Sequence, residues 1–105
     1  MPAHGSQPIT LKVAPKATAA PAYLTVRTTI ENDAENRALE VVVQSADYST
    51  SSQVQLDGVR APRTTMFAFS SLPKVVYEVT AVLMGSQGKR AVATGWFQAM
   101  PSPGE

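Results

Sequence analysis

Residues able to do catalytic chemistry are scarce in this chain of 105 residues. The one histidine, His4, lies in an N-terminal segment that also contains proline, glycine and serine, and the chain has no cysteine. A Ser–His–Asp triad needs its histidine on a rigid element, so we predict no triad here. The lack of thiols excludes a cysteine nucleophile, a disulfide framework and a thiolate metal centre.

The eight acidic residues offer one candidate pair of catalytic carboxylates. Glu40 and Glu78 project outward from two strands that we expect to pair. Glycoside hydrolysis needs two carboxylates facing each other across a cleft, whereas the face of a sheet is flat. Solvated surface charge is the better interpretation. We therefore predict that the chain is not an enzyme and has no catalytic residues and no cofactor.

Oxygen-bearing side chains gather at residues 31–36, a segment that contains Glu31, Asp33, Glu35 and two asparagines. Calcium takes several oxygens of this kind. The spacing does not match an EF-hand, and turn propensity alone explains asparagine and aspartate at these positions. We favour a turn and predict no metal ligands, with a calcium site as the alternative.

The overall charge is nearly balanced, with nine basic and eight acidic residues and a net charge of +1. This balance gives no basic stripe for a phosphate backbone, so we predict no nucleic-acid partner. The longest apolar runs are far shorter than the roughly 20 residues of a membrane helix, so we expect no membrane insertion. The first eight residues do not resemble a secretory signal, and an exported or cell-surface location is favoured only if the chain is a module of a longer protein.

Alternating hydrophobic residues predict short β-strands along the chain. The clearest run covers residues 23–30, where Leu24, Val26 and Ile30 share one face. The strand over 48–56 is rich in serine and threonine and should lie at a sheet edge. A short helix over 33–39 is the alternative for that segment. The predicted strands are residues 9–13, 23–30, 38–45, 48–56, 64–69, 75–84 and 89–98, with a hairpin loop at 85–88.

Seven strands at this spacing predict an all-β fold, namely a seven-stranded antiparallel immunoglobulin-like β-sandwich with Greek-key connections. The expected domain spans residues 9–100, with flexible tails at 1–8 and 101–105. The expected core contains Leu11, Val13, Leu24, Val26, Ile30, Leu39, Val41, Val43, Phe67, Phe69, Leu72, Tyr77, Val79, Ala81 and Leu83.

One segment resembles a known class of domain. Phe67 and Phe69 precede a Leu72–Pro73 corner, and Tyr77 then opens the next strand. This pattern resembles the strand–corner–strand segment of immunoglobulin-like and fibronectin type III-like domains, including bacterial prealbumin-like ones, in which the tyrosine hydroxyl bonds back to the corner backbone. The prealbumin-like domains usually have glycine where this chain has Val75. The resemblance implies a β-sandwich with a buried Tyr77.

The last predicted strand places Trp96 on the same side as Arg90, and the charged residue marks that side as solvent-facing. Trp96 would then be part of an exposed apolar patch of the kind that binds or packs against a partner. A bulge that reverses the alternation and buries Trp96 is the equal alternative. The candidate interaction surface comprises Val42, Glu78, Val82, Arg90, Val92 and Trp96.

These observations favour a non-catalytic immunoglobulin-like structural or protein-interaction module, part of a bacterial exported, cell-surface or phage structural protein. Its partner would be a protein, either a neighbouring domain or a second copy of the chain. The alternative is a carbohydrate-binding accessory module of an exported enzyme, with Trp96, Tyr23 or Tyr48 as the platform on which sugar rings stack.

Overall fold

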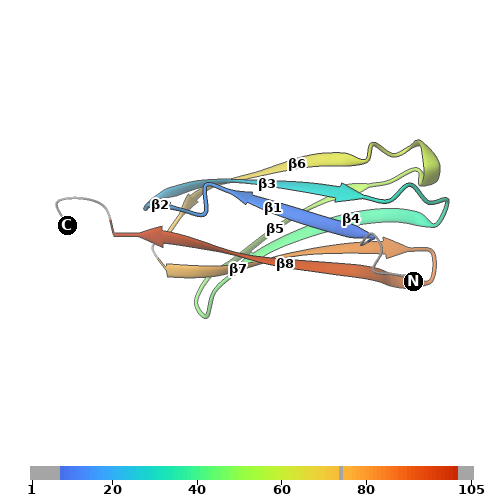
Figure 1. The fold of residues 1–105 in the computed structure, drawn as a ribbon. Coiled ribbons are helices and arrows are strands. Elements are labelled where there is room, and N and C mark those ends of the chain that lie inside the picture. The colour runs from blue at the N-terminus through green and yellow to red at the C-terminus, as the bar shows by residue number, and fades with distance from the viewer. Residues whose placement is uncertain (1–7, 74, 102–105) are drawn as a thin grey trace, which may run out of the picture.

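The computed structural model describes residues 8–73 and 75–101, and these residues form an all-β fold of two sheets (Figure 1). A three-stranded antiparallel sheet has the order β1-β3-β6, formed by Ile9–Ala14, Ala22–Ile30 and Thr64–Leu72. A five-stranded sheet has the order β2-β8-β7-β4-β5, formed by Ala17–Ala19, Gly88–Met100, Val75–Gly85, Asn36–Gln44 and Ser49–Gln55. One 3-10 turn, η1, covers Gly58–Arg60.

The two sheets enclose one hydrophobic core because the strands alternate between buried and exposed residues. In β3 the alternation is complete, and Leu24, Val26 and Ile30 are all buried. β4 and β7 supply the opposite wall of the core through their own alternating residues. Every predicted core residue is buried except Leu11, which is partly buried against the core. Phe97 is fully enclosed and was absent from the prediction.

The strand pairing was largely predictable. β4 pairs with β7, β7 and β8 form the expected hairpin, and β5 lies at a sheet edge. The alternative helix over 33–39 is wrong, since a turn at Ala34 and Glu35 leads directly into β4. Strand propensity of the β-branched residues in 41–43 and pairing on both sides of β4 decide this segment.

The expectation of seven antiparallel strands needs correction. β2 is an eighth strand, and it pairs in parallel with the end of β8, so the five-stranded sheet is mixed. β2 lies in the connector between Pro15 and Pro21, each of which follows a cis peptide bond. Three small residues carry no alternation that a sequence pattern could detect, which explains why this strand was missed.

The corner formed by Leu72 and Pro73 has the predicted hydrogen bond. The Tyr77 hydroxyl donates to the Pro73 carbonyl oxygen at 2.6 Å, and the Tyr77 ring is fully buried. The ring stacks on Phe97 at 6.3 Å between ring centroids and meets the edge of Tyr48 at 6.1 Å. Burial, with a smaller effect of Tyr48, raises the pKa of Tyr77 above its usual value. Tyr77 therefore links the corner to Phe97 on β8 and to Tyr48, which lies just before β5.

The predicted tails fall almost entirely outside the described residues, which exclude 1–7 and 102–105. His4 lies in this excluded part of the chain. Within the described residues, no helix is long and apolar enough to cross a membrane.

Candidate functional site

The outer face of β7 and β8 holds the largest exposed aromatic side chain. Trp96 is 61% exposed, and its cross-strand neighbour on β7 is Glu78. Val92 is 44% exposed and pairs with Val82. Val76 is 54% exposed and lies diagonal to Trp96, because its partner is Gln98. The five residues Val76, Glu78, Val82, Val92 and Trp96 are here called the Trp96 face.

The alternation along β8 is regular from Val92 to Met100, so Trp96 points outward and Phe97 points into the core. The alternative in which a bulge buries Trp96 is therefore wrong. A bulge does occur in this hairpin, but it lies at Arg90, the extra residue between Lys89 and Ala91 where the register with β7 shifts. Val42, also a candidate, lies on β4 beside Thr80 and is half-buried.

Arg90 does not belong to the Trp96 face. Its guanidinium donates to Asn36 Oδ1 at 2.5 Å and to Asp33 Oδ2 at 3.0 Å. The bulge at Arg90 disturbs the alternation, which explains why the side chain turns to the end of the molecule instead of following Val92 and Trp96. Arg90 instead bonds to the 31–36 segment, which the sequence predicts to be a turn, and forms a polar cluster with it.

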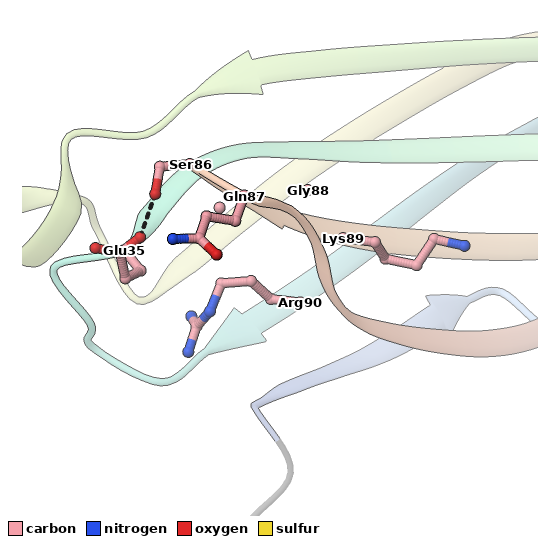
Figure 2. A pocket seen from close by; sticks show the side chains of 7 residues that line it. Glu35, Ser86, Gln87, Gly88, Lys89 and Arg90 are labelled. Atoms are coloured by element: carbon pink, nitrogen blue, oxygen red, sulfur yellow. Dashed lines mark hydrogen bonds between the residues drawn. The ribbon is translucent and has the colours of Figure 1, made fainter.

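This polar cluster connects the 31–36 loop with the β7–β8 hairpin. Asn36 is fully buried and donates through Nδ2 to the Glu31 carbonyl oxygen at 2.9 Å. Asp33 accepts from the Glu35 backbone N–H at 2.7 Å, and Ser86 donates to the Glu35 carboxylate. Glu35 and residues 85–90 of the hairpin line a pocket of about 300 Å³. In Figure 2 the side chains of Lys89 and Arg90 point in opposite directions.

Side-chain oxygens of three residues in the candidate calcium segment, Asp33, Glu35 and Asn36, are already bonded within this cluster. Asp33 and Asn36 both accept from Arg90, which supplies the positive charge that a cation would bring. Among residues 8–73 and 75–101, no group of three or more histidine, cysteine, aspartate or glutamate side chains is arranged to hold a metal ion. The arrangement is that of a structural link between loop and hairpin.

The three aromatic residues considered for sugar stacking lie apart. Trp96 is on the five-stranded sheet, whereas Tyr23 is on β3 of the other sheet and is 58% exposed. Tyr48 is partly buried against the core and packs edge-on against Tyr77. The structure therefore does not bring these rings together on one face.

The two-sheet arrangement is similar to the fold of solved superoxide reductases. Three solved structures of superoxide reductase (neelaredoxin) from Ignicoccus hospitalis, two of them single-substitution variants, match the chain with TM-scores of 0.62, 0.61 and 0.62. Sequence identity is 14%, 12% and 14%; the matches cover 89%, 89% and 90% of this chain and 80%, 80% and 82% of those chains. No family model matches the chain, and no curated protein matches it.

This likeness corrects three expectations. Assignment to the immunoglobulin-like or fibronectin type III-like class is wrong, since the structural neighbours are superoxide reductases and the sheets are a three-stranded and a mixed five-stranded one. The prediction of a non-catalytic immunoglobulin-like module, with its carbohydrate-binding alternative, is wrong for the same reason. The shared identity is low, so the likeness shows the fold alone. The prediction that the chain is not an enzyme is overturned as well, because the solved structures with a similar fold are superoxide reductases.

The local resemblance around Tyr77 explains the error. A tyrosine that follows a Leu–Pro corner reports how two strands connect, and the structure contains that connection. It does not report how many strands follow on each side or how the sheets pair. Two all-β folds can share this segment and differ in the rest of the chain.

Superoxide reduction implies a resident redox group, and we compared the donor set of this chain with the needs of a redox-active transition metal. Such metals are held best by imidazole and thiolate ligands. The chain has no cysteine and one histidine, His4, outside the described residues. The described carboxylates form no cluster of three, and Asp33 is engaged by Arg90. The residues described here do not fit such a metal centre.

Proposed function

We propose that the chain binds a protein partner through the Trp96 face. The observation that carries the proposal is the 61% exposure of the Trp96 indole, on a face that also exposes Val76, diagonal to it on β7, and Val92, four residues before it on β8. Tryptophan is enriched at the energetic centres of protein interfaces because its large surface is covered in the complex. Glu78, the cross-strand neighbour of Trp96, and Glu40, beside Val82 on β4, would disfavour association with unrelated proteins.

The two sheets differ in a way that supports this assignment. The outer face of β3 presents Tyr23 together with Thr25 and Arg27, so its exposed aromatic ring lies among polar groups. The face of β7 and β8 instead exposes Trp96, Val76 and Val92, with Thr94 between Val92 and Trp96. An apolar group of this kind is typical of a surface that another molecule covers.

The test is photo-crosslinking from position 96, with position 23 as the matched exposed aromatic site on the other sheet. A photoreactive phenylalanine derivative replaces Trp96 or Tyr23, and the chain is irradiated alone and in extract of its native source. We expect a discrete protein adduct from position 96 that Val92→Glu suppresses and that position 23 does not form. Absence of any protein adduct from position 96, or identical adducts from both positions, would overturn the proposal.

A redox activity is the second candidate, and the superoxide reductase fold is the observation that favours it. The donor set described above does not fit a metal centre, so a redox group would have to come from elsewhere. The measurement is the rate of superoxide consumption by the purified chain, before and after incubation with ferrous iron, together with the bound iron per chain. A rate and iron content no higher than those of a denatured sample would remove this candidate.

A further inference from the structure

Strand β8 has one paired edge and one that is mostly open. β7 pairs with it along its whole length, from Gly88 to Ala99. On the other side, β2 pairs only with the last residues of β8, from Gln98 to Met100 (Figure 1). Within the described parts of the chain, no strand pairs with this edge before Gln98.

The neighbouring β1 leaves this edge free of backbone pairing. β1 packs across the inner face of β8, where a Cβ added to Gly95 would lie 3.0 Å from Leu11 Cδ1 and 3.4 Å from Val13 Cγ2. Its backbone pairs with β3 in the other sheet. Side-chain packing thus covers the inner face of β8 and makes no ladder with its edge.

The hydrogen bonds to β2 identify which backbone groups face the open edge. The Gln98 N–H donates to the Lys16 carbonyl oxygen at 3.0 Å, and the Met100 carbonyl oxygen accepts from the Ala20 N–H at 2.7 Å. Along a strand, successive residues direct their N–H and C=O groups to opposite edges. Since the register is regular from Val92 onward, the N–H and C=O of Val92, Thr94 and Trp96 point to the open edge. The side chains of the same three residues are exposed.

The open segment of the β8 edge is limited at both ends, by β2 and by the bulge at Arg90. β2 occupies the edge from Gln98 onward, and the bulge at Arg90 interrupts the strand on the other side of Val92. Between these limits the edge has no proline and no charged residue, the usual protections against pairing with another chain. Its length, residues 92–96, is close to that of an average strand, about 5–6 residues.

We propose that a second copy of this chain occupies the open edge, with the two β8 strands antiparallel about a two-fold axis at Thr94. The inference rests on the proposed function and names the partner. In this register Val92 lies opposite Trp96 of the partner subunit, and Thr94 lies opposite its own copy. Every open N–H and C=O group of Val92, Thr94 and Trp96 then has a partner.

The side chains favour this register. Aromatic residues opposite β-branched residues, and threonine opposite threonine, are favourable cross-strand pairs in antiparallel sheets. The register yields two Trp–Val pairs and one Thr–Thr pair on the face that holds Trp96. Sliding the partner strand by one residue along β8 would place outward residues opposite inward ones, which the continuous sheet does not allow.

The neighbouring registers of the correct parity have the axis one residue away, and each is less complete. An axis at Gly95 would place Val92 opposite Gln98, whose N–H already bonds to the Lys16 carbonyl oxygen. An axis at Ala93 would place Trp96 opposite Arg90, at the bulge. With the axis at Thr94, the residues that precede Val92 in the partner strand would meet β2, which pairs with β8 from Gln98 onward. The partner strand must therefore bend away from the sheet just before its Val92. The bulge at Arg90 bends the strand at that point, and the bonds from Arg90 to Asp33 and Asn36 hold the bend.

The test uses the absence of cysteine from the native chain. In Thr94→Cys the two new thiols would face each other across the axis, where Cα atoms of a hydrogen-bonded pair are about 5.5 Å apart, within disulfide range. We expect a covalent dimer to form in a mild glutathione redox buffer at micromolar protein. Ser51→Cys is the matched control, because Ser51 is exposed on the same face at the opposite edge of the sheet.

A second variant tests the backbone ladder without a thiol. Thr94→Pro removes an N–H that points to the open edge, so the chain itself loses no hydrogen bond. Gln53→Pro is the control: the Leu56 N–H donates to the Arg37 carbonyl oxygen, so alternation directs the Gln53 N–H away from β4. By sedimentation, we expect the native chain and Gln53→Pro to reach the mass of a dimer and go no higher. We expect Thr94→Pro to associate at least tenfold more weakly.

The outcomes separate this inference from the proposed function. Equal disulfide formation by Thr94→Cys and Ser51→Cys, or a monomeric native chain at all concentrations, would overturn the two-fold pairing. If position 96 then still forms an adduct with a different protein, the proposed function stands and the partner is not a second copy. If position 96 forms no protein adduct, both proposals are wrong.

Discussion

Trp96 and Phe97 are adjacent in the chain and have opposite environments. Phe97 is 1% exposed and stacks on Tyr77, whereas Trp96 is 61% exposed. Alternation along β8 produces this difference. Phe97→Ala is expected to lower the free energy of unfolding by about 3–5 kcal/mol, and Trp96→Ala by less than about 1 kcal/mol. Urea denaturation of both variants measures this, and a loss of about 3 kcal/mol or more for Trp96→Ala would show that the indole is a core residue.

The Tyr77 hydroxyl contributes one buried hydrogen bond, to the Pro73 carbonyl oxygen. Tyr77→Phe keeps the ring and removes the bond, so we expect a loss of about 1 kcal/mol in unfolding free energy. Tyr23→Phe is the matched control, because its ring is exposed, and it should change stability by less than about 0.5 kcal/mol. Equal stability of the Tyr77 variant and the native chain would contradict the role of this bond.

Burial raises the pKa of Tyr77, and this has a consequence for alkaline stability. The folded chain holds the phenol proton more tightly than the unfolded chain, whose tyrosine pKa is close to 10.0. Stability from this difference is complete below that pKa and is lost as pH rises through the folded value. We expect unfolding free energy to fall above about pH 10, and to fall less steeply in Tyr77→Phe. Identical pH dependence in both proteins would contradict this prediction.

At the scale of elements, Asn36 holds the 31–36 loop against the β7–β8 hairpin. It is buried at the start of β4, donates to the Glu31 carbonyl oxygen and accepts from Arg90. Asn36→Ala removes both bonds from a buried position, so we expect a loss of about 2 kcal/mol in unfolding free energy. Glu35→Ala removes an exposed contact with Ser86 and should cost less than about 0.5 kcal/mol. Similar losses in the two variants would show that the cluster does not depend on Asn36.

The two edges of the five-stranded sheet differ in the polarity of their side chains. β5 is rich in serine and glutamine, and it forms one edge without any covering strand among the described residues. Before Gln98, where β2 begins to pair with it, β8 forms the other edge and carries Trp96 and Val92 beside its open backbone groups. Polar side chains reduce the gain from covering β5, whereas apolar ones increase the gain from covering β8. This contrast places the proposed pairing at β8.

At the scale of the whole molecule, the strands run along one long axis (Figure 1), and the fold measures 50 × 28 × 22 Å. The polar cluster lies at the hairpin end and the Trp96 face lies along the side of the sheet. The two features are therefore separate surfaces. A ligand at the hairpin end and a partner along the sheet would contact different residues.

The hairpin end provides a test for calcium. A cation bound by the folded chain alone would stabilise it by about 2.7 kcal/mol at a concentration 100 times its dissociation constant. Asp33 and Asn36 already accept from Arg90, so we expect millimolar calcium to leave Tm unchanged. Arg90→Ala frees these oxygens and serves as the comparison in the same thermal scan. A clear rise in Tm of the native chain with calcium would contradict this prediction.

The sequence by itself determined the strands, most of the core and the Tyr77 corner. Alternation at 23–30, 38–45 and 75–84 predicts directly which side chains are buried, because each strand packs one of its two faces against the core. For Trp96 the alternation left an outward and a buried position as equal alternatives, and the structure decided between them. These are local properties, and the residues that set them are neighbours in the chain.

Only the tertiary structure decided the sheet membership of β2, the bulge at Arg90 and the partners of Asp33 and Asn36. β2 is too short to carry a pattern and pairs with residues about eighty positions away. The Arg90 side chain reaches a loop 54 positions earlier in the chain for its bond to Asn36. The open edge of β8 likewise depends on where β2 ends and where β1 packs. Long-range backbone pairing sets all of these, and it leaves no periodic signal in the residues that take part.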